Sequence, residues 1–324
     1  MESDAGKDAG VISGTLRHVM RYTENIHDSV SKNFLRTVGR VDDYFGNRYY
    51  VKTRQKSAAV LTLDTYIKEG SLAFRPNINA KIDLPGTQDR FNVIVTHIQE
   101  ETLDRMSAME RVRNSQDYFA QAFNRTGNSA GSDNNSTTFV GLRYARQLTK
   151  HLANHVDLGL NYNFLPRPWV LPKPYGSYNL DLTHDIKNFL IRQDNKLFWE
   201  MGSDAGYSGA LVLTRQLAQN LLLESEFDGN RTFVKPNWTM LETVSLNWIA
   251  SDRDIITPMF QATMNSTPAF IATMYTVAVN WRRRLHNDWL FFGAAPEIDY
   301  PRDHAFGPQY RLTLSLEVIF GFAG

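Results

Sequence analysis

Several side chains in this chain could do chemistry, and their spacing decides which chemistry. His151 and His155 are four residues apart, the interval at which two imidazoles on one helical face can bind a metal. They flank a predicted turn and strand instead, so we expect no metal site. Gly206-Tyr207-Ser208-Gly209 begins like a nucleophile elbow, but the G-x-S-x-G pattern ends at Ala210. We therefore predict no catalytic residues, no cofactor and no enzymatic activity.

Charged residues recur at every second position of several segments, which puts their side chains on one face of a strand. Arg192, Asp194, Lys196 and Glu200 share one such face. Because both signs occur together, these charges could line an open polar pore without strong ion selectivity, or form salt bridges that fill a closed interior. The residues predicted to face the interior, or lumen, are Arg75, Lys81, Arg143, Asp157, Asp181, Arg192, Glu297, Arg311 and Glu317.

The segments that carry these charges alternate between apolar and polar residues. The last one, Tyr310 to Phe322, places leucine, valine and aromatic residues on one face and mostly polar residues on the other. Similar segments recur from Ser57 onward. We predict about fourteen strands of roughly ten residues, near the length that crosses a bilayer at a tilt. Twelve strands would also fit, because Phe198 to Phe233 divides in more than one way.

The composition limits the class of protein. Hydrophobic residues make up 42% of the chain, and the mean hydropathy is -0.38. No stretch approaches the roughly 18 to 20 apolar residues of a membrane-spanning helix. The net charge of +1 gives no reason to expect a nucleic acid partner. The absence of cysteine excludes disulfides and thiolate chemistry.

Two all-β architectures fit the alternating strands. A soluble β-sandwich would turn the apolar faces inward, whereas a transmembrane antiparallel β-barrel would turn them toward lipid. Trp248, Trp281 and Trp289 fall at or near strand ends, where membrane-interface aromatic residues belong. Closure into a barrel would also remove the sheet edges, which nothing else in the sequence protects. We therefore predict the barrel, with the last strand closing it on Ser57 to Lys68.

Two regions differ from the predicted strands. Residues 1–55 have apolar residues at helical spacing and form a predicted amphipathic helical segment, while residues 56–324 form the barrel. Residues 100–136 form an inserted loop with helical spacing in its first half and many Gly, Ser and Asn residues in its second. The N-terminal segment could lie in the periplasm, along the inner membrane face of the barrel or in association with the lumen, or it could dock a partner protein. Its predicted docking residues are Leu16, Val30, Phe34, Val38 and Phe45.

The tight turns predict the orientation of the barrel. Four short polar turns, around Lys150, Asn220, Asp252 and Asn287, fall on one side if the strands alternate in direction. Short turns are typical of the periplasmic side of outer-membrane barrels, so the insertion would lie outside the cell. The first ten residues are polar and contain no apolar run. We therefore expect that a signal peptide has been removed from this sequence.

The final segments add a resemblance. Tyr275 to Gly321 contains a strand with Arg282, a short turn, an aromatic strand with Trp289, and a closing strand. This region resembles an uncharacterised family of proteobacterial outer-membrane β-barrel proteins, and so does the helix that ends near Phe45. The shared motif residues are Arg282, Trp289, Pro296, Glu297, Pro301, Arg302, Glu317, Val318, Phe320 and Gly321. The resemblance implies an outer-membrane barrel and implies no activity.

Arg282-Arg283-Arg284 ends one predicted strand next to a turn. These arginines could bind lipid phosphate or an acidic partner. We favour the simpler interpretation that they snorkel from the strand end toward water.

Two functions remain for an outer-membrane barrel in contact with lipid. The polar inner faces favour a passive channel for small polar solutes. The N-terminal amphipathic helix favours a scaffold or anchor that transports nothing and docks a periplasmic protein. The sequence identifies neither a solute nor a partner.

Overall fold

Fourteen antiparallel strands make up most of the described chain. The computed structural model describes residues 23–34, 36, 57–68, 71–83, 91–98, 137–163, 171–186, 189–201, 205–234, 237–267, 269–286 and 289–320. The strands are β1 (Ala58–Lys68), β2 (Ser71–Asp83), β3 (Phe91–Ile98), β4 (Thr137–Thr149), β5 (Leu152–Asn163), β6 (Lys173–Ile186), β7 (Phe189–Glu200), β8 (Ala205–Ala218), β9 (Leu221–Thr232), β10 (Thr239–Ile249), β11 (Asp254–Asn265), β12 (Ile271–His286), β13 (Leu290–Pro301) and β14 (Gln309–Phe320). A short 3-10 helix, η3 (Arg302–His304), separates the last two strands.

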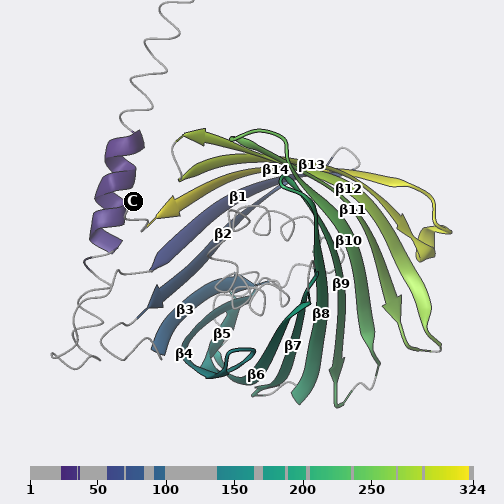
Figure 1. Cartoon of the computed structure of the whole chain (residues 1–324), viewed down its shortest axis with the longest axis horizontal. Coiled ribbons are helices and arrows are strands. Elements are labelled where there is room, and N and C mark those ends of the chain that lie inside the picture. The colour runs from purple at the N-terminus through teal and green to yellow at the C-terminus, as the bar shows by residue number, and fades with distance from the viewer. Residues whose placement is uncertain are drawn as a thin grey trace, which may run out of the picture.

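The strands form a closed ring (Figure 1). Each strand pairs with the next along the chain, and β14 pairs with β1 from Ala59↔Phe320 to Lys68↔Arg311. Closure pairs the backbone groups that a sheet edge would leave exposed, which is what allows strands to cross a membrane. The predicted closed barrel of 14 strands, with its seam between the first and last strands, is confirmed.

The barrel turns its apolar residues outward. In β14 the side chains of Tyr310 and Leu316 are 65% and 40% exposed, whereas Arg311 and Glu317 are buried. Successive side chains of a strand point to opposite faces, so in a closed ring one set faces outside and the other faces the lumen. A water-soluble sandwich would bury its apolar set. The sandwich alternative is therefore wrong.

The four predicted tight turns lie at one end of the barrel. They connect β4 to β5, β8 to β9, β10 to β11 and β12 to β13. Since successive strands run in opposite directions, these connections share the end at which β1 begins and β14 finishes. The prediction that the turns share one side is confirmed. We call this end the rim of the termini.

The N-terminal helix, residues 23–34, lies outside the wall beside the end of β14 (Figure 1). His27 Nε2 hydrogen-bonds the Ile319 carbonyl at 2.8 Å. The same imidazole stacks on Trp289, with ring centroids 4.2 Å apart. Glu24 lies 3.7 Å from His286. The helix is therefore held at the rim of the termini.

Only part of the predicted N-terminal segment can be compared with the structure. Val30 is exposed and Phe34 is half-buried on the described helix. Leu16, Val38 and Phe45, like the insertion at residues 100–136, lie outside the described residues. Within the described ranges, no helix is long and apolar enough to span a membrane.

Candidate functional site: the inner wall

A buried ion pair joins β4 and β5 on the inner face of the barrel. Arg143 and Asp157 are register partners, so their side chains point to the same side. Arg143 Nε donates to Asp157 Oδ1 at 2.6 Å, and its Nη2 donates to Oδ2 at 2.8 Å. Both side chains are almost wholly buried. A guanidinium that forks onto a carboxylate in this way makes two charge-assisted hydrogen bonds and fixes the orientation of both groups.

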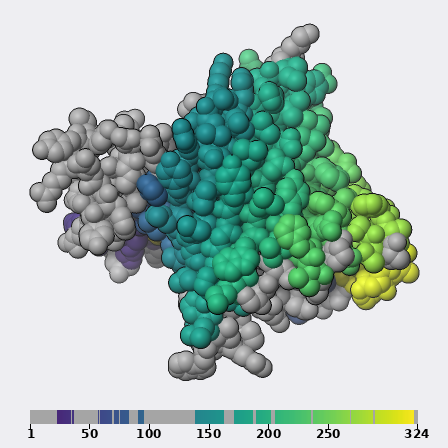
Figure 2. Space-filling view, turned by 90° about the horizontal axis from the view of Figure 1, so that it is seen from below, coloured from purple at the N-terminus to yellow at the C-terminus, as the bar shows by residue number. Residues whose placement is uncertain are grey.

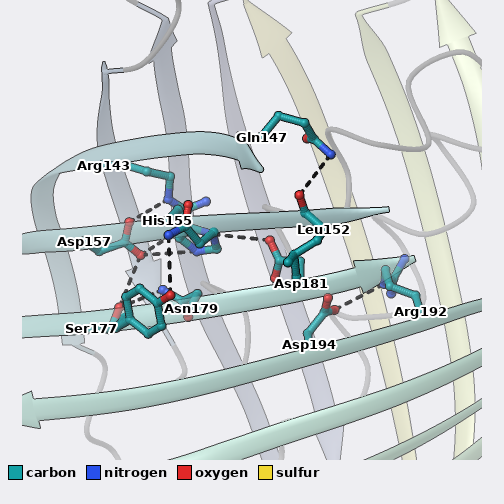
Figure 3. Close-up of polar contacts among 12 residues, drawn as sticks. Arg143, Gln147, Leu152, His155, Asp157, Ser177, Asn179, Asp181, Arg192 and Asp194 are labelled. Atoms are coloured by element: carbon teal, nitrogen blue, oxygen red, sulfur yellow. Dashed lines mark hydrogen bonds and ion pairs between the residues drawn. The ribbon is translucent and has the colours of Figure 1, made fainter. Parts of the chain in front are cut away.

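Asp157 belongs to a wider polar network that continues onto β6 (Figure 3). The Ser177 hydroxyl donates to Asp157 Oδ2 at 3.4 Å, and Asn179 donates to Ser177 at 3.0 Å. His155 lies between two carboxylates: its Nδ1 is 3.4 Å from Asp181 and its Nε2 is 3.8 Å from Asp157. Three neighbouring strands thus share one continuous polar surface.

The same surface extends to β7. Arg192 Nε donates to Asp194 Oδ2 at 3.2 Å on the inner face of that strand. Lys196 follows two residues later and places its ammonium 5.6 Å from the ring centres of both Tyr175 and Phe198, close enough for cation–π attraction. We define the first cluster as Arg143, His155, Asp157, Asp181, Arg192 and Asp194.

A packed aromatic ring positions the first cluster. Phe139 is wholly buried, and its ring occupies the space next to Gly141 and Gly159, which face each other across β4 and β5. A Cβ on Gly141 would lie 2.3 Å from the Phe139 ring, and one on Gly159 would lie 2.3 Å from the Val140 carbonyl. Tyr175 adds an edge-to-face contact to Phe139 at 5.4 Å. These contacts hold β4 against β5 two residues away from the Arg143–Asp157 ion pair.

A second set of charges lies on β12, β13 and β14. Arg311 pairs with its register partner Glu297, and its Nη2 lies 3.4 Å from Asp299. The Thr276 hydroxyl donates to Asp299 at 2.7 Å. Residues of β12 and β14 thus both contact Asp299, as residues of β4 and β6 both contact Asp157.

Arg282 completes this second set. Its Nη2 donates to Glu317 Oε1 at 2.6 Å, and its guanidinium lies 3.7 Å from the centre of the Phe291 ring. Arg282 and Glu317 are both buried. We define the second cluster as Thr276, Arg282, Glu297, Asp299, Arg311 and Glu317.

The two clusters lie on opposite walls. β5 and β12 are seven places apart in a ring of fourteen strands, so the side chains of the two clusters face each other across the lumen. Each ion pair named above joins residues of one strand or of strands no more than two places apart. These pairs therefore run along the walls and do not cross from one wall to the other.

The structure assembles most of the predicted lumen residues into the two clusters. Arg143, Asp157, Asp181 and Arg192 belong to the first, and Glu297, Arg311 and Glu317 belong to the second. All seven side chains are buried. Lys81 is half-buried on β2. Arg75 pairs in register with Asp64, and its side chain is outside the described residues.

The three predicted interface tryptophans all lie near the rim of the termini. Trp248 is 44% exposed on the outer face of β10. Trp281 is half-buried, and its indole Nε1 donates to Asp254 at 3.0 Å. Trp289 differs from the other two tryptophans, because it is only 7% exposed and lies beneath the His27 ring. Its ring contacts His27 of the N-terminal helix and His286 of β12.

Sequence reasoning missed His155, Asp299 and the role of Arg282. His155 and Asp299 each lie two residues from a predicted lumen residue, so strict alternation could have found them. Arg282 was assigned to a snorkelling rim patch with Arg283, and that assignment is wrong. Alternation turns Arg282 inward to Glu317, while Arg283 turns outward to within 3.5 Å of Asp254.

The inner wall has no described arrangement that suits a metal. Across the described ranges, no group of three or more His, Asp or Glu side chains is placed to hold an ion. His155, Asp157 and Asp181 approach one another, but Arg143 already occupies both oxygens of Asp157. Arg143 thus takes the place that a cation would need at Asp157.

Comparisons with known proteins find no sequence match and only distant structural similarity. No family model and no curated protein matches the sequence. Among solved structures, OprB of Pseudomonas putida aligns with 82% of this chain and 94% of its own, at 9% identity and a TM-score of 0.49. The outer-membrane channel DcaP of Acinetobacter baumannii aligns with 82% and 97%, at 8% identity and a TM-score of 0.44. A KdgM porin aligns with 80% and 98%, at 6% identity and a TM-score of 0.35. The fold assignment rests on the strand pairing, and the resemblance to a proteobacterial family stays a prediction.

Proposed function

We propose that this protein is an outer-membrane barrel that passively conducts small polar solutes. The observation that carries the proposal is the division of the wall into an apolar outer face and an inner face with two charged clusters on opposite sides. Lipid is the natural solvent for the outer face, and water and polar solutes are the natural contents of the inner one.

The size of the ring supports conduction. Eight strands enclose an interior just wide enough for side chains to fill, and barrels of sixteen or more leave an aqueous channel. A barrel of fourteen strands is closer in width to these channel-forming barrels than to the eight-stranded ones. Because the named ion pairs run along the walls, they hold charged side chains back from the axis. We infer a lumen with charges of both signs and weak ion selectivity.

A pair at the end of the barrel opposite the termini offers a direct test. Lys173 Nζ lies 3.0 Å from Glu200 Oε1, on the inner faces of β6 and β7, and the two side chains are 41% and 20% exposed. Partly exposed pairs of this kind contribute little to stability, on the order of 1 kcal/mol or less. Lys173→Gln and Glu200→Gln should therefore fold, and each removes one charge near a mouth of the lumen.

Planar-bilayer recording of the purified full chain is the experiment. The wild-type protein should conduct, with a reversal potential near zero in a KCl gradient. Lys173→Gln should shift the reversal potential toward cation selectivity, and Glu200→Gln should shift it toward anion selectivity. Folded protein without conductance, or shifts of the same sign in both variants, would overturn the proposal.

A second candidate function is a scaffold that docks a periplasmic protein. The described helix keeps Ile26 and Val30 exposed at 47% and 43% while it is bound to the rim. Crosslinking pull-downs should then lose a partner with the variant Ile26→Ser/Val30→Ser. An unchanged set of partners would reject docking through this face.

A further inference from the structure

Two amide side chains interrupt the apolar outer face of β7. Along this strand, Phe189, Leu197 and Trp199 are exposed outer-face residues. Gln193 and Asn195 occupy the two positions in the middle of the same row. The amides therefore lie midway along the strand, where a membrane-spanning segment meets hydrocarbon and not headgroups.

Neighbouring residues orient the amides. The Tyr207 hydroxyl on β8 donates to Asn195 Oδ1 at 2.7 Å, and Gln193 Nε2 donates to the same oxygen at 3.3 Å. Tyr207 can reach Asn195 because its ring lies over Gly209, whose Cβ would be 2.8 Å from the Tyr207 oxygen. The Asn195 carbonyl is thus occupied. Among the described residues, its NH2 group and the Gln193 carbonyl have no hydrogen-bond partner.

Lipid cannot supply what these amides need. Hydrocarbon neither donates nor accepts hydrogen bonds, so an amide that faces it without a partner is strongly disfavoured. The surroundings are otherwise apolar: Leu211 and Leu213 of β8 are each 40% exposed. Figure 2 views the molecule from the side on which β6 to β8 lie in Figure 1, and the teal and green strands form a broad continuous surface there. The amides thus form a small polar centre within an apolar surface.

We propose that this outer face of β6 to β8 binds a second copy of the same chain. The argument rests on the membrane location in the proposed function and on the complementarity of primary amides. A two-fold axis along the membrane normal brings equivalent residues of two copies together at the same depth. A primary amide carries both donors and an acceptor, so it is its own complement. The free NH2 of Asn195 and the free carbonyl of Gln193 then find partners in the second copy.

Cysteine crosslinking tests this pairing because the chain contains no cysteine. Leu211 is the register partner of Gln193 and is exposed, so Leu211→Cys places a thiol beside the amides and leaves them intact. Leu316→Cys is the matched control: it has the same 40% exposure and lies on β14, opposite β7 in the ring. In oxidised membranes, Leu211→Cys should give a disulfide-linked dimer and Leu316→Cys should remain monomeric.

The second step removes the amides from the Leu211→Cys variant. Gln193→Leu/Asn195→Leu should abolish the dimer of Leu211→Cys, while Thr65→Val on the outer face of β1 should leave it unchanged. A gel-mobility difference between heated and unheated samples checks that each barrel is folded. Equal crosslinking at positions 211 and 316, a monomeric Leu211→Cys, a dimer that persists without the amides, or a crosslink to another protein would each overturn the proposal.

Conductance separates this inference from the proposed function. Since the amides face outward, the monomeric double variant should conduct as the wild-type protein does. A protein that dimerises without conducting would overturn only the channel. A protein that conducts but whose Leu211→Cys variant stays monomeric would overturn only the dimer.

Discussion

Removing one partner of the Arg143–Asp157 pair should strongly destabilise the barrel. Two charge-assisted hydrogen bonds of 2.6 and 2.8 Å join the side chains, which are only 3% and 4% exposed. Arg143→Met leaves the Asp157 carboxylate in the wall with the Ser177 hydroxyl, at 3.4 Å, and His155 nearby. Breaking a buried pair in this way costs about 3–5 kcal/mol, most of it from the charge left behind.

The double variant Arg143→Met/Asp157→Leu should cost less than the sum of its single variants, because neither charge remains. We expect a coupling energy on the order of 2 kcal/mol. Tryptophan fluorescence in a urea titration of the folded protein in lipid vesicles measures both quantities. Arg283→Gln is the control, since Arg283 is 46% exposed and its distance to Asp254 is 3.5 Å.

Two results would refute this reasoning. The first is a single-variant cost near that of Arg283→Gln, which we expect to be below about 1 kcal/mol. The second is a double variant whose cost equals the sum of the single costs. Either result would mean that solvent screens the two charges and that they do not act as a buried, coupled pair.

Three further predictions concern packing. Gly159→Ala should lower the free energy of unfolding by about 1–3 kcal/mol, because the new Cβ would lie 2.3 Å from a backbone oxygen. Gly176→Ala should cost less in the same urea titration, because its Cβ would meet a flexible side chain, at 3.3 Å. His27→Ala should speed hydrogen exchange across residues 23–34 because stacking and a hydrogen bond are lost, and exposed Asn25→Ala should not; equal rates would contradict the contact. Trp281→Phe should cost about 0.5–1.5 kcal/mol through the lost indole hydrogen bond, and an unchanged urea midpoint would contradict it.

The architecture could be predicted because alternation is a local property. The apolar and polar faces of the last segment follow from the sequence alone, and over Tyr310 to Phe320 the closed ring turns them outward and inward as expected. The number of strands between Phe198 and Phe233 could not be decided locally. Pairing decides it, since β8 finds partners along its length in both β7 and β9.

The candidate site was predictable residue by residue but not pair by pair. Alternation assigns Arg311 and Glu317 to one face, yet it does not say which anion each cation meets. Register decides this: Arg311 lies opposite Glu297, and Glu317 is reached by Arg282 from two strands away. Three consecutive arginines also resemble a rim patch, and this similarity hid the inward position of Arg282.

The contact between the N-terminal helix and the barrel had no local signal. His27 and Ile319 are 292 positions apart, and their hydrogen bond depends on where the last strand ends. The helical spacing of the segment predicted an apolar face, but not that a histidine on that helix would bind the rim. The outer-face amides of β7 gave a local signal, since they break an apolar row, but their outward direction becomes certain only with the register of β6 to β8.

The described helix acts on the seam of the barrel and not on the lumen wall. Its partners at the rim include Trp289, Ile319 and Phe320, where β13 begins and β14 ends beside the closing pair of strands. Pairing β14 with β1 joins the two ends of the barrel sequence, so a contact that holds the end of β14 also holds the ring closed. These contacts support closure from outside the wall, and none of the helix contacts described above involves a residue of either charged cluster.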